Sequence, residues 1–144
     1  MERITHDGEL LAIIIPADHQ EAGVQFFTPP EFSQQLAYMK HPTGHVIDAH
    51  THKPVSREVH LTQEALFIRR GRLRVDFYTH ETEYLESRTL AAGDVILLTA
   101  GGHGFEVLEE VEMVEVKQGP YAGDADKVRF EGTGPPESPT RVRE

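Results

Sequence analysis

The apolar residues of this 144-residue chain occur in short groups, and this spacing constrains the fold more than any other feature. Glycine, proline or charged residues separate the groups at intervals typical of an all-β sandwich or barrel. Alternation is clearest at 72–78, where Leu73, Val75 and Phe77 share one face. No group keeps a helical period over three turns, although 29–39 could hold a short helix. The sequence predicts an all-β fold with strands near 9–16, 23–27, 34–39, 45–52, 64–70, 72–78, 94–100, 104–108 and 111–116.

Turn residues divide these strands. Gly71 lies between two strand patterns and predicts a tight hairpin. Gly93 and Asp94 predict a second turn, and the proline and charges of 53–60 predict a loop. We expect one domain over residues 1–130. Residues 131–144 are rich in proline and glycine and poor in apolar residues, which predicts a flexible tail.

Composition narrows the choice of partners and compartment. The net charge of −10 comes from 14 basic and 24 acidic side chains. Phosphate backbones and anionic lipids repel such a chain, so we expect neither nucleic acid nor membrane as a partner. The absence of cysteine excludes a disulfide scaffold and thiol catalysis, and it fits a reducing compartment. The N-terminus has no secretory signal pattern. We therefore expect a cytoplasmic protein.

A histidine pair, His50 and His52, is the first candidate for chemistry. On a strand, residues two apart point to the same face about 7 Å apart, so both imidazoles could bind one metal ion. The chain has nine histidines, however, and a pair on a solvent-exposed strand face would look the same. The pair alone leaves both interpretations open.

The residues around the pair favour the metal site. Gly44, five residues, His50-Thr51-His52 and then Glu64, six residues and Gly71 resemble the first sequence motif of the cupin superfamily, here over 44–71. Residues 93–108 are similar to the second cupin motif, which supplies a third histidine, here His103.

The chain also departs from the cupin pattern. Eleven residues separate His52 from Glu64, which is longer than the usual cupin spacer. Within the second motif, Thr99 and Val107 replace a proline and an asparagine, and the gap before His103 is one residue shorter. Three alternatives follow: His60 in the long spacer could replace Glu64, Glu64 could instead pair with Arg69 or Arg70 across the predicted hairpin, and His103 could simply lie in a glycine-rich turn.

The resemblance implies a cupin-type double-stranded β-helix, which is a jelly-roll barrel. It also implies one divalent transition metal ion (Fe, Mn, Ni, Cu or Zn) bound by three histidines and one glutamate. The predicted ligands are His50, His52, Glu64 and His103. The implied function is a metal-dependent enzyme of oxygenase or isomerase/epimerase type acting on a small polar molecule.

Two other functions stay open: a non-catalytic cupin that binds a sugar or sugar nucleotide, and a metal-free sugar-nucleotide isomerase. Many cupins are dimers that share edge strands, so we expect a homodimer. Residues 9–16 are the candidate for crossing between subunits, because they have no obvious strand partner nearby in sequence.

The stretch 112–121 can face the core in two ways. Either Val114 and Val116 are buried, or Met113, Glu115 and Lys117 face inward. Buried valine is the commoner arrangement. In the second register, Glu115 and Lys117 would line the pocket as acid/base candidates.

Overall fold

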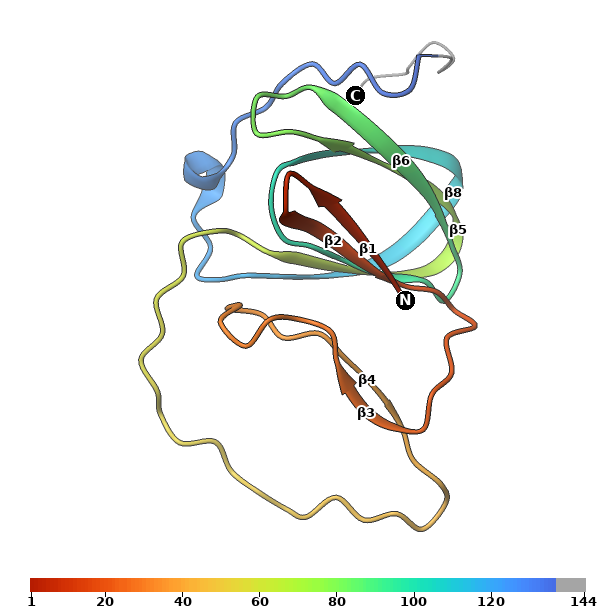
Figure 1. The fold of residues 1–144 in the computed structure, drawn as a ribbon, viewed down its shortest axis with the longest axis vertical. Coiled ribbons are helices and arrows are strands. Elements are labelled where there is room, and N and C mark those ends of the chain that lie inside the picture. The colour runs from red at the N-terminus through yellow and green to blue at the C-terminus, as the bar shows by residue number, and fades with distance from the viewer. Residues whose placement is uncertain (137–144) are drawn as a thin grey trace.

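The computed structural model describes residues 1–136, which form β-strands and one short 3₁₀ turn (Figure 1). The described residues contain no α-helix, and no helix long and apolar enough to cross a membrane. The elements are β1 (Glu2–His6), β2 (Glu9–Ile15), β3 (Gly23–Phe26), β4 (Ala37–Lys40), β5 (Glu64–Tyr78), β6 (Tyr84–Ala91), β7 (Val95–Leu98), β8 (Gly102–Lys117) and the 3₁₀ turn η1 (Gly123–Asp126).

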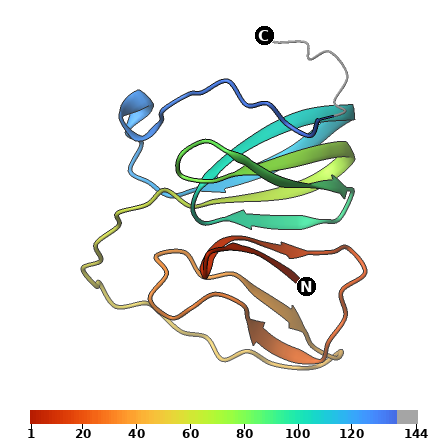
Figure 2. The same cartoon turned by 45° about the horizontal axis from the view of Figure 1, so that its top comes forward.

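Six strands form one antiparallel sheet in the order β1-β2-β7-β5-β6, with β8 paired to β5. The sheet curls strongly into a half-barrel (Figure 2). A separate hairpin, β3–β4, packs against the β2 side of this sheet. The predicted all-β class is confirmed.

Strand β5 has a bulge around Gly71, which contributes to the curl. Gly71 has φ +84, and a Cβ there would overlap the carbonyl oxygen of Glu110 on β8. The register between β5 and β8 shifts at several positions between Ile68 and Leu73. Such bulges bend and twist a strand. The predicted hairpin at Gly71 is therefore wrong: one 15-residue strand passes through it.

This bulge also reverses the side-chain alternation of β5. Leu66 and Ile68 on one side of it, and Leu73, Val75 and Phe77 on the other, all belong to the main apolar cluster. A regular strand would point these even- and odd-numbered positions to opposite faces. We call the face that carries these five side chains the inner face.

Strand β2 explains the uninterrupted apolar run near the N-terminus. Ala12 and Ile14 belong to the main cluster, whereas Ile13 and Ile15 pack with Phe27 in a second cluster. A strand buried on both faces has no polar alternation. Both of its edges are paired within the chain, by β1 and β7, so this strand does have partners that the sequence did not suggest.

Several expected strands differ from the observed ones. Residues 64–70 and 72–78 form the single strand β5, and 104–108 and 111–116 lie in the single strand β8. The strand expected at 45–52 is wrong, because 41–63 has no regular secondary structure. Strands β1 and β6 were not expected, since their residues alternate little in polarity. The possible helix in 29–39 is absent from the described chain.

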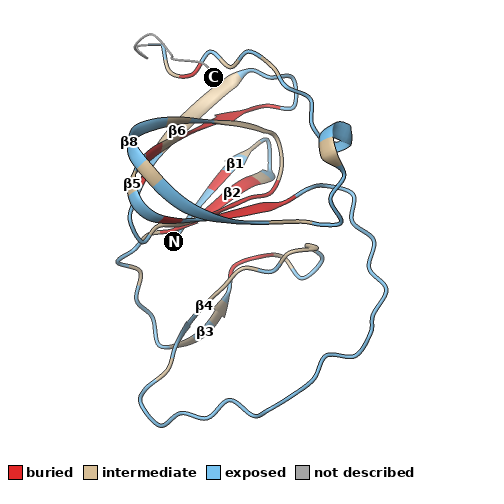
Figure 3. Cartoon of the chain, turned by 180° about the vertical axis from the view of Figure 1, so that it is seen from behind, coloured by how far each residue is buried: buried red, intermediate tan, exposed pale blue. Residues whose placement is uncertain are grey.

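Residues 42–62, which we call the arm, extend away from the sheet, and every one of them is exposed (Figure 3). The loop predicted at 53–60 is confirmed within it.

At the other end of the chain, the Gly134 N–H donates to the Tyr78 hydroxyl at 2.9 Å, which anchors the described part of the predicted tail. Residues 137–144 of that tail lie outside the described residues.

Candidate functional site

Glu64 begins β5 and is nearly buried, with 9% of its surface exposed. It shares its strand parity with Leu66 and Ile68, so its carboxylate projects from the inner face among apolar neighbours. A buried carboxylate is costly unless a cation or hydrogen-bond donor accompanies it. The Glu64 carboxylate therefore requires a cation or a hydrogen-bond donor beside it.

That partner is His103, at the start of β8. His103 lies opposite Phe77 in the ladder, so its ring also belongs to the inner face. Its Nε2 is 3.2 Å from Oε2 of Glu64. The alternative pairing of Glu64 with Arg69 or Arg70 does not occur among residues 1–136, since Glu64 pairs with His103 and Arg70 pairs with Glu112.

The electrostatics around Glu64 favour its charged form. The hydrogen bond from His103 lowers the pKa of the Glu64 carboxyl, burial opposes this, and the nearby charges of His103, Lys117 and Lys127 lower it further. Glu64 is therefore an ionised acceptor, the state in which a carboxylate binds a metal ion or orients an imidazole.

The second half of β8 adopts the less common of its two registers. Glu115 lies opposite Leu66, and Lys117 lies opposite Glu64, so both project from the inner face. Val114 and Val116 are on the outer face and remain 46% and 49% exposed. The preference for buried valine fails here because, among residues 1–136, no second layer covers the outer face at this end of β8.

The histidine pair lies elsewhere. His50 and His52 belong to the exposed arm, with ring centroids 5.2 Å apart. Nδ1 of His50 is 2.8 Å from the Asp48 carbonyl oxygen, which orients that ring. The two imidazoles are thus close to one another, but they do not lie on the strand that the sequence predicted.

His60, the alternative ligand, is also exposed, and its Nε2 is 3.7 Å from a Glu58 carboxylate oxygen. It borders two open cavities of about 470 and 410 Å³. Lys117 and Gln118 line the first, and Gln63 and Thr99 line the second. Among residues 1–136, no hydrogen bond or ion pair joins His60 to Glu64.

The four predicted ligands therefore form two separate pairs. Within residues 1–136, no group of three or more His, Cys, Asp or Glu side chains is placed to hold a metal ion. One chain, as described, does not present a complete four-ligand site.

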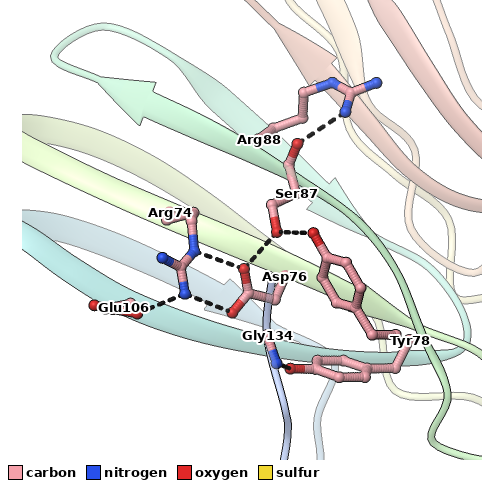
Figure 4. A network of polar contacts seen from close by, with 8 residues as sticks. Arg74, Asp76, Tyr78, Ser87, Arg88, Glu106 and Gly134 are labelled. Atoms are coloured by element: carbon pink, nitrogen blue, oxygen red, sulfur yellow. Dashed lines mark hydrogen bonds and ion pairs between the residues drawn. The ribbon is translucent and has the colours of Figure 1, made fainter. Parts of the chain in front are cut away.

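Sequence reasoning missed a polar network on the outer face (Figure 4). Arg74 donates from Nε to Asp76 at 2.8 Å and also pairs with Glu106 on β8, while the Ser87 hydroxyl donates to Asp76 at 2.6 Å. Asp76 is only 2% exposed. The alternation at 72–78 places Arg74 and Asp76 on one polar face, but nothing in the sequence signals their burial.

Gln63 was also missed. It is 5% exposed, and its Oε1 has no hydrogen-bond partner among the described residues. In the sequence, only its position directly before the predicted strand 64–70 could have pointed to its burial.

Comparison with protein-family models found none that matches, and searches of curated proteins and of solved structures found no match either. The resemblance to cupins therefore depends on the residues quoted above and stays a prediction.

Proposed function

We propose that this chain is a divalent-metal-binding protein of cupin type, a double-stranded β-helix that acts on a small polar molecule. The observation that supports this most is the meeting of Glu64 and His103. These are two of the four residues that the cupin resemblance names, and they come from opposite ends of the β5–β8 ladder to lie 3.2 Å apart on the inner face.

The donor types suit such an ion. One ionised carboxylate with neutral imidazoles is a common ligand set for Fe, Mn, Ni, Cu or Zn. Two donors are too few for a stable mononuclear site, and His50 and His52 lie on the arm. We therefore derive no reaction step through the metal. The chain's own residues contribute as follows: the hydrogen bond from His103 lowers the pKa of Glu64, and Lys117 and Glu115 add a cation and a carboxylate to the same face.

Elemental analysis of untagged protein, after dialysis against each candidate metal, tests this proposal. We expect about one ion per chain in the wild type and a loss of binding in Glu64→Gln, His103→Ala and His50→Ala. His80→Ala is the matched control, because His80 lies on an exposed turn and pairs with Glu9. A wild type that retains no ion from any of these metals would refute the proposal and favour the metal-free isomerase.

Gln63 favours a second candidate function, a barrel that binds a small ligand without turnover. A buried amide oxygen without a partner is costly, and this side chain lines the cavity of about 410 Å³. A ligand with a hydroxyl or amide donor would satisfy it. Calorimetric titration with a panel of sugars and sugar nucleotides, using Gln63→Leu as the variant, tests this. Binding without turnover, lost in Gln63→Leu, would support it; no binding across the panel would contradict it.

A further inference from the structure

The arm lacks the contacts that a connection of its length normally makes. It joins β4 to β5 without regular secondary structure, and its apolar side chains face solvent: Val46 is 77% exposed, and Ile47 and Val55 are each 61% exposed. Structureless connections of this length are uncommon in compact proteins, where they are usually functional loops, such as binding loops, or linker segments. The arm therefore exposes unpaired backbone and apolar surface that a partner could cover.

Strand β8 presents the complementary surface. It is 16 residues long and pairs only with β5, so within residues 1–136 its other edge carries no strand. Apolar side chains along it are also exposed, including Phe105 and Val107. A long exposed edge strand readily accepts an added strand, and proteins seldom leave such an edge uncovered.

The charges of the two segments complement each other. Strand β8 carries five glutamates and a single lysine. The arm carries Lys53, Arg57 and four of the chain's nine histidines, against one aspartate and one glutamate. Electrostatic complementarity of this kind selects a partner and its orientation.

An added strand would bring the separated histidines to the inner face. In paired strands, neighbouring residues share a face, and residues two apart lie on the same face. A strand along the free edge of β8 in the appropriate register therefore carries His50 and His52 together onto the face that already holds His103 and Glu64.

The position of the arm decides which copy of the chain can supply the strand that adds to the β8 edge. In its own chain, most of the arm passes on the β3–β4 side of the molecule, away from β8 (Figures 1 and 3). We propose that the arm of one copy adds to the β8 edge of a second copy, so that His50 and His52 of each copy complete the Glu64–His103 site of the other. A two-fold exchange of this kind covers both free edges and both arms at once. This inference builds on the metal site proposed above.

Subunit mixing tests the exchange. Two variants are co-expressed with different tags: His50→Ala/His52→Ala, which keeps an intact body, and Glu64→Gln/His103→Ala, which keeps an intact arm. The heterodimer, purified through both tags, then contains one complete site if ligands are exchanged. We expect it to bind about half as much metal per chain as the wild type, and each variant alone to bind none.

The possible failures can be told apart. A wild type that binds metal, with a heterodimer that binds none, would overturn the exchange and leave the metal site within one chain. A wild type that binds no metal would instead overturn the proposed function. The assembly itself is measured without metal, by sedimentation of the wild type, where we expect twice the 16.2 kDa chain mass.

Substitutions on the arm test whether it holds the dimer. We expect Val46→Asp/Ile47→Asp to weaken dimerisation at least tenfold. Val128→Asp, at a position that is 91% exposed and outside both segments, is the matched control and should leave the mass unchanged. A monomeric wild type, or a dimer insensitive to the arm substitutions, would overturn the proposal.

Discussion

Nε2 of His103 and Oε2 of Glu64 lie 3.2 Å apart, although His103 is opposite Phe77 and Glu64 is at the other end of the same strand. A 15-residue strand that ran straight would separate them by about 40 Å. The contact therefore depends on the curl of the β5–β8 ladder. The curved ladder that bends at Gly71 is therefore also what brings the two residues of the candidate site together.

The lowered pKa of Glu64 gives a pH dependence to the metal-free protein. A carboxyl whose pKa is lower in the folded state than its ordinary value of 4.5 stabilises the fold above that value. This contribution is lost as the pH falls through the folded pKa. Glu64→Gln removes the titration, so its unfolding free energy, measured with urea in the presence of chelator, should fall less steeply below about pH 5 than that of the wild type. Parallel curves would show that the His103 hydrogen bond contributes nothing.

Substitution of Gly71 should destabilise the fold strongly. Alanine there meets a positive φ and overlaps the Glu110 carbonyl oxygen. The matched control is Gly8→Ala, which has a similar φ of +79 but no atom within 4 Å of the added Cβ. We expect Gly8→Ala to cost about 1 kcal/mol from backbone strain alone. Gly71→Ala should cost about 2 kcal/mol more, because the strands must move apart. Equal losses in urea unfolding would mean that the close approach is easily relieved.

The buried polar network on the outer face should contribute more to the free energy of unfolding than the exposed ion pairs beside it. Asp76→Asn removes the charge that faces Arg74, whose side chain is 11% exposed, and should cost about 3 kcal/mol. Glu109→Gln, which removes the partner of Arg72 at an exposed site, is the control and should change stability by less than about 1 kcal/mol. Denaturant midpoints measured in one buffer compare the two, and similar shifts would contradict the assigned burial.

The fold class followed from the sequence because local alternation reports one strand at a time. Leu73, Val75 and Phe77 are buried together as the pattern predicts. The pattern could not show that Gly71 is a bulge, because glycine with positive φ serves hairpins and bulges equally. Nor could it reveal the register of Glu115 and Lys117, which is fixed by pairing with β5.

The two pairs of candidate ligands differ in how far the sequence could place them. Glu64 and His103 meet because both lie on strands that pair with neighbours. The strand expected at 45–52 is absent from the described chain because nothing in that chain pairs with it. Local sequence preference cannot form a strand without a neighbour, since the backbone groups must find partners.

Removing the Tyr78 hydroxyl should release the C-terminal segment. Tyr78 is 1% exposed, accepts the Gly134 N–H at 2.9 Å and packs edge-on against Phe130, with ring centroids 5.0 Å apart. Tyr78→Phe keeps the ring contact but leaves a buried N–H without its partner, at a cost of about 1 kcal/mol. We expect faster amide exchange at Gly134 and earlier proteolytic cleavage after Lys127 or Arg129. Tyr121→Phe, at a position 90% exposed, is the control and should change neither. Unchanged exchange at Gly134 would show that the Tyr78 hydroxyl does not hold this segment in place.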